Sequence, residues 1–289
     1  MRCDYSGVRP EFEDDPMVIR ELQNGSCFVS TQEDHAELSA QLAAHWGNEK
    51  FSRLRPYDTM VFATTYHDSG YREWEGNPPI HLAKGRPYAH RETIPSFEPV
   101  ELQAYAKNVE WLHTRDRYAS LLVSMHRTGL WANRYDVFTS PKGRMRERSA
   151  EVMAAKRALE ARQEQEKNAL SAGKMAFVDE LWFNFRALQI FDLLSLYFCC
   201  DGYADDEQFK EDLIAPVSVS YDSKEEVELR IFPAGPRTVR FVPYPFDVAP
   251  LTVGVRARLL TAGRFASEAE GLAAYHKAPR QILSFEIVE

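Results

Sequence analysis

Residues 177–200 constrain the fold more than any other stretch of the chain. They are apolar on every side of a predicted helix, and a helix that is hydrophobic all round is buried. Asp192 is the only acidic residue after Glu180 in this helix. An isolated buried carboxylate is costly unless it is paired or bound to a metal. We therefore expect partners for Asp192 from other elements, with Gln189 and Ser195 on its own face of the helix to orient it.

A His-Asp doublet, His67-Asp68, closes a second predicted helix that begins after Pro56. The preceding residues Met60-Val61-Phe62-Ala63 are apolar enough to be buried, and Gly70 can end the helix in a left-handed conformation. Neighbouring side chains on a helix diverge by about 100°, so the side chains of His67 and Asp68 do not easily both point at solvent. Both can bind one metal cluster if other helices supply the remaining ligands.

Two further histidines lie on predicted helices. His35 lies in the first turns of a helix that opens with a capping box, Ser30 to Glu33. His126 ends the apolar helix 118–125. Imidazole nitrogen and carboxylate oxygen together suit Fe, Mn, Zn, Co or Ni, and ligands from separate helices converge in the core of a bundle. The sequence therefore predicts a site for a divalent transition metal built from the following residues: His35, His67, Asp68, His126 and Asp192.

The order of these residues, a His, a His-Asp pair, a His and a late Asp in an apolar helix, resembles the HD-domain superfamily of metal-dependent enzymes over residues 31–200. His67-Asp68-Ser69-Gly70 matches the doublet motif of that superfamily, and Phe191-Asp192-Leu193-Leu194 matches its terminal Asp motif. From Met17 onward, including Pro243-Tyr244-Pro245-Phe246, the chain also looks like an uncharacterised bacterial family with an HD-like core, which brings no known activity.

This resemblance implies a ligand set for a first ion: His35, His67, Asp68 and Asp192. Asp68 would bridge to a second ion where one is present. Two-metal members add two further histidines between the doublet and the last Asp, and the candidates are His90 and His126, with His113 as a substitute. The resemblance therefore implies one or two divalent transition-metal ions. Tyr71 stands where many phosphohydrolases of the superfamily carry Lys, which argues against hydrolysis of simple phosphomonoesters or cyclic nucleotides.

Residues 69–98 form a long irregular stretch rich in Gly, Pro and aromatic residues. A loop of this length in a compact domain is usually functional or disordered, and because it starts beside the doublet we expect it to cover the metal site as a lid. Glu73 or Glu75 would then transfer protons. The side chains expected to bind substrate are three cations that clamp an anion and two aromatics: Lys84, Arg86, Arg91, Tyr71 and Trp74.

The apolar residues after Pro216 alternate as in half-buried strands, and Asn24-Gly25 between β-prone runs predicts an N-terminal hairpin. We therefore expect a mainly α fold, with an HD-like helical bundle core and a small antiparallel β-sheet from the N-terminal hairpin and the C-terminal strands. The expected divisions are a disordered extension, a β-hairpin, an HD-like helical metal-binding domain and a β-rich region packed on the same domain: residues 1–16, 17–30, 31–214 and 215–289.

The composition limits the partners and the compartment. The formal net charge is -8 and the pI is about 5.6, which argues against nucleic acid or an anionic membrane as partner. No apolar run approaches the ~20 residues that span a bilayer. Four cysteines without a C-x-x-C pair argue against a structural zinc site or disulfides. We expect a cytoplasmic protein that acts on a small molecule, and the sequence does not indicate its oligomeric state.

Three functions agree with this pattern. The leading interpretation is a metal-dependent hydrolase that uses metal-activated water on a small anionic substrate. The second is an oxygenase, because some HD-domain proteins resemble this chain in lacking the phosphohydrolase Lys and use a two-iron site to cleave carbon bonds with O₂. The third is a non-catalytic module that senses a metal or a ligand. The number and identity of the bound ions would separate the first two.

Overall fold

The computed structural model describes residues 17–289, apart from 90–91, 93–96, 133–137, 140–147, 173–176, 201–203, 206–207 and 262. Its helices are α1 (Gln32–His45), α2 (Tyr57–Tyr66), η1 (Ser69–Tyr71, a 3-10 turn), α3 (Arg72–Glu75), α4 (Glu98–His113), α5 (Arg117–Trp131), α6 (Ala150–Ser171), α7 (Phe177–Cys199) and α8 (Glu268–Lys277). Its strands are β1 (Met17–Glu21), β2 (Cys27–Thr31), β3 (Ile80–His81), β4 (Arg86–Pro87), β5 (Phe138–Thr139), β6 (Ala204–Asp205), β7 (Gln208–Phe209), β8 (Asp212–Ser218), β9 (Glu226–Gly235), β10 (Thr238–Val242), β11 (Leu251–Leu260) and β12 (Arg280–Val288).

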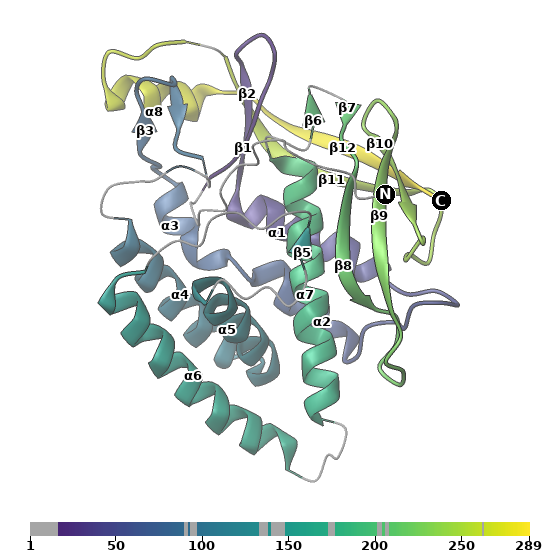
Figure 1. Ribbon diagram of the computed structural model, residues 1–289. Helices are drawn as coiled ribbons and strands as arrows, with labels where there is room; N and C mark the ends of the chain where they lie inside the picture. The colour runs from purple at the N-terminus through teal and green to yellow at the C-terminus, as the bar shows by residue number, and fades with distance from the viewer. Residues whose placement is uncertain are drawn as a thin grey trace, which may run out of the picture.

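Eight of the described strands form one mixed sheet in the order β1-β2-β11-β12-β10-β9-β8-β5. β10 and β12 pair in parallel, and the other neighbours pair antiparallel. The N-terminal hairpin joins the C-terminal strands through the pairing of β2 with β11. Figure 1 shows this sheet as a curled layer along one side of the helices.

The predicted mainly α fold with a small sheet is wrong, and so is its description as a helical bundle, because the sheet is a major layer of the molecule. β9 and β11 have 10 residues each and β12 has 9. Alternating periodicity reveals a strand locally, but it does not show how many strands join one sheet. The sheet also takes in β5, which lies between α5 and α6 along the chain, and β8 begins before Pro216.

One hydrophobic core joins the sheet to the helices. α7 runs between the sheet and the helices α4, α5 and α6 (Figure 1) and is buried over most of its length, which confirms the buried helix predicted from its sequence. α1 packs against α7, α2 and β11. Phe241 and Phe285 from the sheet share a cluster of buried side chains with Leu38 of α1 and Phe191 of α7. Because this cluster is continuous, the sheet supports the two helices that carry His35 and Asp192.

The first turn of α1 is capped by Thr31 and not by the predicted pair Ser30 and Glu33. The Asp34 N–H donates to Thr31 Oγ1 over 3.0 Å, and the Thr31 N–H donates to Asp34 Oδ2 over 3.1 Å. Such a reciprocal cap satisfies two backbone donors that the helix itself leaves unpaired. It therefore fixes the turn from which His35 projects.

Residues 69–98 are more regular than expected, since the described part contains η1, α3 and the hairpin β3-β4. α8 packs against β3, β4 and β11 and lies at the far end of the sheet from α2 in Figure 1. None of the helices in the described part of the chain is long and apolar enough to cross a membrane.

Candidate metal centre

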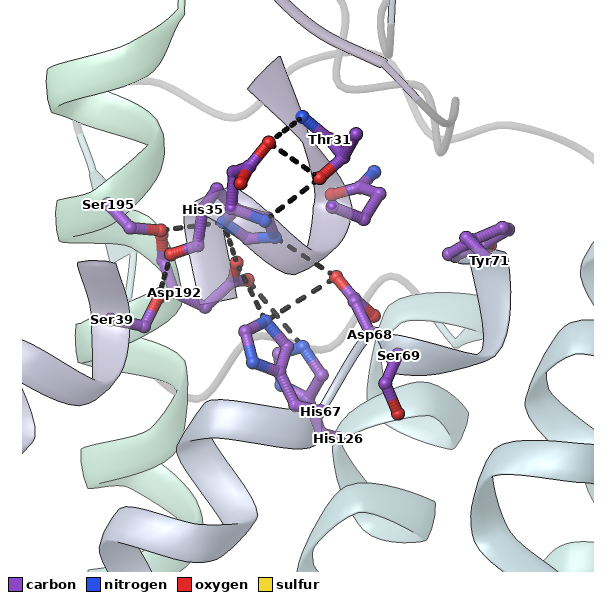
Figure 2. A network of polar contacts seen from close by, with 12 residues as sticks. Thr31, His35, Ser39, His67, Asp68, Ser69, Tyr71, His126, Asp192 and Ser195 are labelled. Carbon is purple, nitrogen blue, oxygen red and sulfur yellow. Dashed lines mark hydrogen bonds and ion pairs between the residues drawn. The ribbon is translucent and has the colours of Figure 1, made fainter. Parts of the chain in front are cut away.

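Three elements bring four of the predicted ligands together in the core (Figure 2). His35 lies on α1, His67 and Asp68 follow the last turn of α2, and Asp192 lies in the middle of α7. One nitrogen or oxygen atom from each residue lies within 4.8 Å of the others. Their exposed fractions are 1%, 0%, 7% and 4% in that order. The structure therefore contains a buried group of two imidazoles and two carboxylates that could bind a metal ion.

The spacing of the ligand atoms fits a shared ion. Asp68 Oδ2 lies 3.2 Å from His35 Nε2 and 3.4 Å from His67 Nε2. Asp192 Oδ1 lies 3.5 Å from His67 Nε2. Two ligand atoms that each lie about 2.1 Å from an ion are about 3.0 Å apart at a right angle and about 3.4 Å apart at the tetrahedral angle. The observed separations agree with these values.

Both imidazoles are held through Nδ1. His67 Nδ1 donates to the Thr64 carbonyl over 2.8 Å. Ser195 Oγ donates its one proton to the Asp192 carbonyl over 2.8 Å, so it accepts from His35 Nδ1 over 2.7 Å. Each ring therefore presents Nε2 to the carboxylates, and His67 Nε2 is buried without a hydrogen-bond partner among the described residues. A ring fixed through one nitrogen presents the other as a metal ligand.

The electrostatics of the group favour a cation. Burial alone would raise the pKa of Asp192, but the neighbouring imidazoles of His67, His126 and His35 lower it to about 2. Burial also opposes ionisation of Asp68, yet His67 and His35 hold the pKa of this carboxyl well below its usual range. Burial lowers the pKa of His67, and the two carboxylates outweigh this effect and raise the pKa to about 9. The centre therefore requires positive charge, from protons or from an ion.

The turn that carries the doublet is anchored to α4. Asn108 Nδ2 donates to the carbonyls of Tyr66 and His67 over 2.9 and 2.8 Å, and Ser69 Oγ donates to Asn108 Oδ1 over 2.7 Å. A Cβ atom at Gly70 would overlap the Ala104 carbonyl oxygen. Gly70 is therefore required for close approach of the two backbones, and the predicted left-handed conformation is wrong because its φ is not positive.

Of the other three predicted histidines, the two that the structure describes do not belong to the four-residue group. His126 Nε2 lies 3.5 Å from Asp192 Oδ2, so it adjoins the four-residue group without belonging to it. His113 Nε2 lies 3.2 Å from Glu166 Oε1 on α6, where it is part of a half-exposed ion pair. His90 lies outside the described residues.

The two predicted proton-transfer carboxylates lie in opposite environments. The Glu73 side chain is 83% exposed and pairs with Lys107 Nζ at 2.8 Å, so its carboxylate is at the surface. Glu75 is buried, and its Oε1 accepts a hydrogen bond from the Gln32 N–H at the start of α1. Burial raises the pKa of Glu75 well above its usual value. Neither residue belongs to the four-residue group.

The predicted anion clamp is neutralised by acidic partners. Arg86 is buried and pairs with Glu21 and Glu92, each at 2.8 Å. Lys84 also pairs with Glu92. Arg91 lies outside the described residues. The structure therefore places Lys84 and Arg86 in an ion-pair cluster with carboxylates.

Tyr71 and Trp74, the predicted aromatic contacts, belong to one aromatic row. Tyr71 is buried, with its ring centroid 6.1 Å from that of Phe97 and 5.3 Å from that of Tyr105. Trp74 contacts Phe97 at 5.4 Å and lines a cavity of about 470 Å³ with Ile80 and other side chains. The segment that leaves the doublet therefore begins in the core.

Tyr105 is a residue of the centre that the sequence did not indicate. Its hydroxyl donates to Asp68 Oδ1 over 2.8 Å. Ser195, which was expected to orient Asp192, holds His35 instead, and the Gln189 amide is buried without a hydrogen-bond partner among the described residues. A Tyr in an amphipathic helix carries no sequence signal of such a contact. The nearest indication is Gly70, because its backbone packs against Ala104 on α4, the helix that also carries Tyr105.

Residues 17–262 match the family described as Protein of unknown function (DUF3891). No curated protein and no solved structure matches the chain.

Proposed function

The chain belongs to the DUF3891 family, and we propose that it is a metal-dependent hydrolase acting on a small molecule. The observation that carries the proposal is the orientation of His35 and His67, each held through Nδ1 with Nε2 directed at a carboxylate. A buried imidazole–carboxylate group weakens a fold unless a ligand satisfies it. The order of His35, the doublet and Asp192 along the chain, which resembles the HD-domain superfamily, supports the same function.

The donor set suits a transition metal. Two nitrogens and two oxygens favour Fe, Mn, Zn, Co or Ni over Mg or Ca. Such an ion, when bound, supplies Lewis acidity that lowers the pKa of water and polarises the bond to be hydrolysed. Of the two carboxylates, Asp68 has the more exposed side chain: its exposed fraction is 10%, against 6% for Asp192. We therefore expect the substrate to approach from the side of Asp68.

His126 would move protons in this reaction. Its Nε2 faces Asp192 Oδ2 at 3.5 Å, and the ring centroid lies 5.5 Å from that of His67. An imidazole oriented by a carboxylate can accept and return a proton near neutral pH. His126 thus lies beside the ligand group with its Nε2 facing a carboxylate oxygen of Asp192.

A two-iron oxygenase is the second candidate, and the same contact favours it. Asp192 directs Oδ1 towards His67 and Oδ2 towards His126, so Asp192 and His126 would help to hold a second ion. Hydrolysis is preferred because, among the described residues, one group of three or more potential ligands is found.

The test begins with elemental analysis of protein purified without chelator. Stripped protein is then reloaded separately with Fe²⁺, Mn²⁺, Zn²⁺, Co²⁺ and Ni²⁺ and assayed against phosphodiesters, carboxylic esters and amides. We expect ion-dependent hydrolysis that falls about 10²-fold or more in His126→Gln, with unchanged metal content. His113→Gln is the matched control, because that ring pairs with Glu166. An ion bound without turnover of any substrate would indicate a sensor, and two irons with O₂ consumption would indicate the oxygenase.

A further inference from the structure

We propose that Tyr105 is the positioning residue of the metal centre, and that it holds Asp68 as a one-oxygen ligand and so limits the centre to a single ion. The inference rests on the proposed metal centre and adds to it a residue and a stoichiometry.

The contact divides the two oxygens of Asp68 between different partners. Oδ2 faces His35 and His67 at 3.2 and 3.4 Å. Oδ1 accepts the hydroxyl proton of Tyr105 over 2.8 Å. A hydrogen bond from a buried phenol to a charged carboxylate is about twice as strong as a neutral one. Because Oδ1 already accepts this hydrogen bond, Oδ2 is the oxygen that Asp68 presents to His35, to His67 and to an ion between them.

The phenol is fixed by its surroundings. The guanidinium carbon of Arg127 lies 3.1 Å from the centroid of the Tyr105 ring, and Arg127 Nη1 donates to Glu101 Oε1 over 2.9 Å. Trp131 Nε1 donates to the same oxygen over 2.7 Å. A cation over an aromatic face is attracted to it and draws electron density from the ring, which strengthens the phenol as a donor. Tyr105 is therefore a rigid donor aimed at one carboxylate oxygen.

Among the described residues, this arrangement leaves few ligands for a second ion. Besides the four-residue group, these residues offer Asp192 Oδ2 and His126 Nε2, which lie 3.5 Å apart. Across the part of the chain that the structure describes, only one group contains three or more potential ligands. The described residues therefore fit one ion.

Tyr105→Phe and Tyr71→Phe make a matched pair of variants. Both positions are buried in the same aromatic cluster, and both substitutions keep the ring and remove one hydroxyl. The Tyr105 hydroxyl contacts Asp68, whereas the Tyr71 hydroxyl accepts from Arg127 over 3.4 Å. The two variants therefore share any general effect on packing and differ in their effect on Asp68.

The measurements use the full-length, metal-stripped chain and the ions alone. Equilibrium dialysis with Mn²⁺ gives affinity and stoichiometry, and the visible absorption of Co²⁺ reports the ligand geometry. We expect one ion per chain in the wild type. We expect binding about 10–100-fold weaker in Tyr105→Phe, with an altered Co²⁺ spectrum, and wild-type behaviour in Tyr71→Phe.

Two results would overturn the proposal: two ions per wild-type chain, or equal affinity and equal Co²⁺ spectra in the two variants. Where Tyr105→Phe does not fold, the stoichiometry of the wild type still tests the single-ion limit, which two ions per chain would overturn. A wild type that binds one ion but hydrolyses nothing would remove the proposed function and leave this inference standing. A wild type that binds no ion would remove both.

Discussion

Glu75 allows a test of the buried polar groups that needs no metal. The residue is buried beside the start of α1, where Oε1 accepts from the Gln32 N–H and Oε2 has no hydrogen-bond partner among the described residues. Burial raises the pKa of Glu75 well above its usual value, although the Gln32 N–H opposes the shift. The folded protein therefore favours the neutral carboxyl. We predict that Glu75→Gln becomes more stable than the wild type as the pH rises.

The direction and size of this effect come from proton linkage. In the unfolded chain a Glu carboxyl has a pKa of about 4.3, and in the folded protein the pKa of Glu75 is higher. The stability that the neutral carboxyl contributes is present below the unfolded pKa and is lost as the pH rises through the folded pKa. Between the two pKa values the loss approaches about 1.4 kcal/mol per pH unit. Glu75→Gln has no proton to lose and retains an oxygen for the Gln32 N–H.

The assay is urea unfolding of the metal-free wild type and variant, monitored by tryptophan fluorescence. It is repeated at intervals of one pH unit from about pH 5 to about pH 8. The difference in unfolding free energy between the two proteins cancels the titration of other groups, including His67. Glu73→Gln is the control, because its exposed partner Lys107 lowers the pKa of Glu73, so no gain with pH is expected. A difference for Glu75→Gln that does not change with pH would refute the reasoning, since Glu75 would then ionise alike in both states.

Three further predictions test the centre and its support. Asp192→Asn and His67→Ala should each abolish ion binding in equilibrium dialysis while circular dichroism retains the helix signal; loss of helix with the ion retained would contradict this. Gly70→Ala should lower the unfolding free energy by about 1–3 kcal/mol because the new methyl group would overlap the Ala104 carbonyl, and an unchanged denaturant midpoint would contradict it. Gln189→Leu should raise the unfolding free energy by about 1–3 kcal/mol because a buried amide without a partner among the described residues is removed; a less stable variant would show that the amide is satisfied.

The ligand group could be predicted because its members break local rules. Asp192 is a charged residue in an apolar helix, and His67 and Asp68 are two polar residues at the end of a second apolar helix. Such conflicts between a residue and its surroundings are expected at functional sites. The spatial partners could not be predicted in the same way, because Ser195 and His35 are 160 positions apart in the chain.

The same limit explains the errors. Lys84 and Arg86 look like a free cationic cluster in sequence, but Glu92 pairs with both, and Glu21 approaches Arg86 from 65 positions away. The sheet is larger than expected because it also takes in β5, from between α5 and α6, through a pairing with β8 that no local pattern shows. Tyr105 was missed because nothing local distinguishes a phenol that meets a carboxylate from one that packs.

The polar core gives this fold a stability that depends on its ligand. Without an ion, the carboxylates of Asp68 and Asp192 lie in the core beside the imidazole of His67, which keeps a proton up to a pKa of about 9. An ion must displace that proton, so its affinity should weaken as the pH falls below that value. An ion that binds only the folded chain adds about 1.4 kcal/mol of stability for each tenfold excess over its dissociation constant. Ion affinity should therefore rise with pH up to about 9, whereas the stability that protonated His67 gives the ion-free fold is lost as the pH rises through the same pKa.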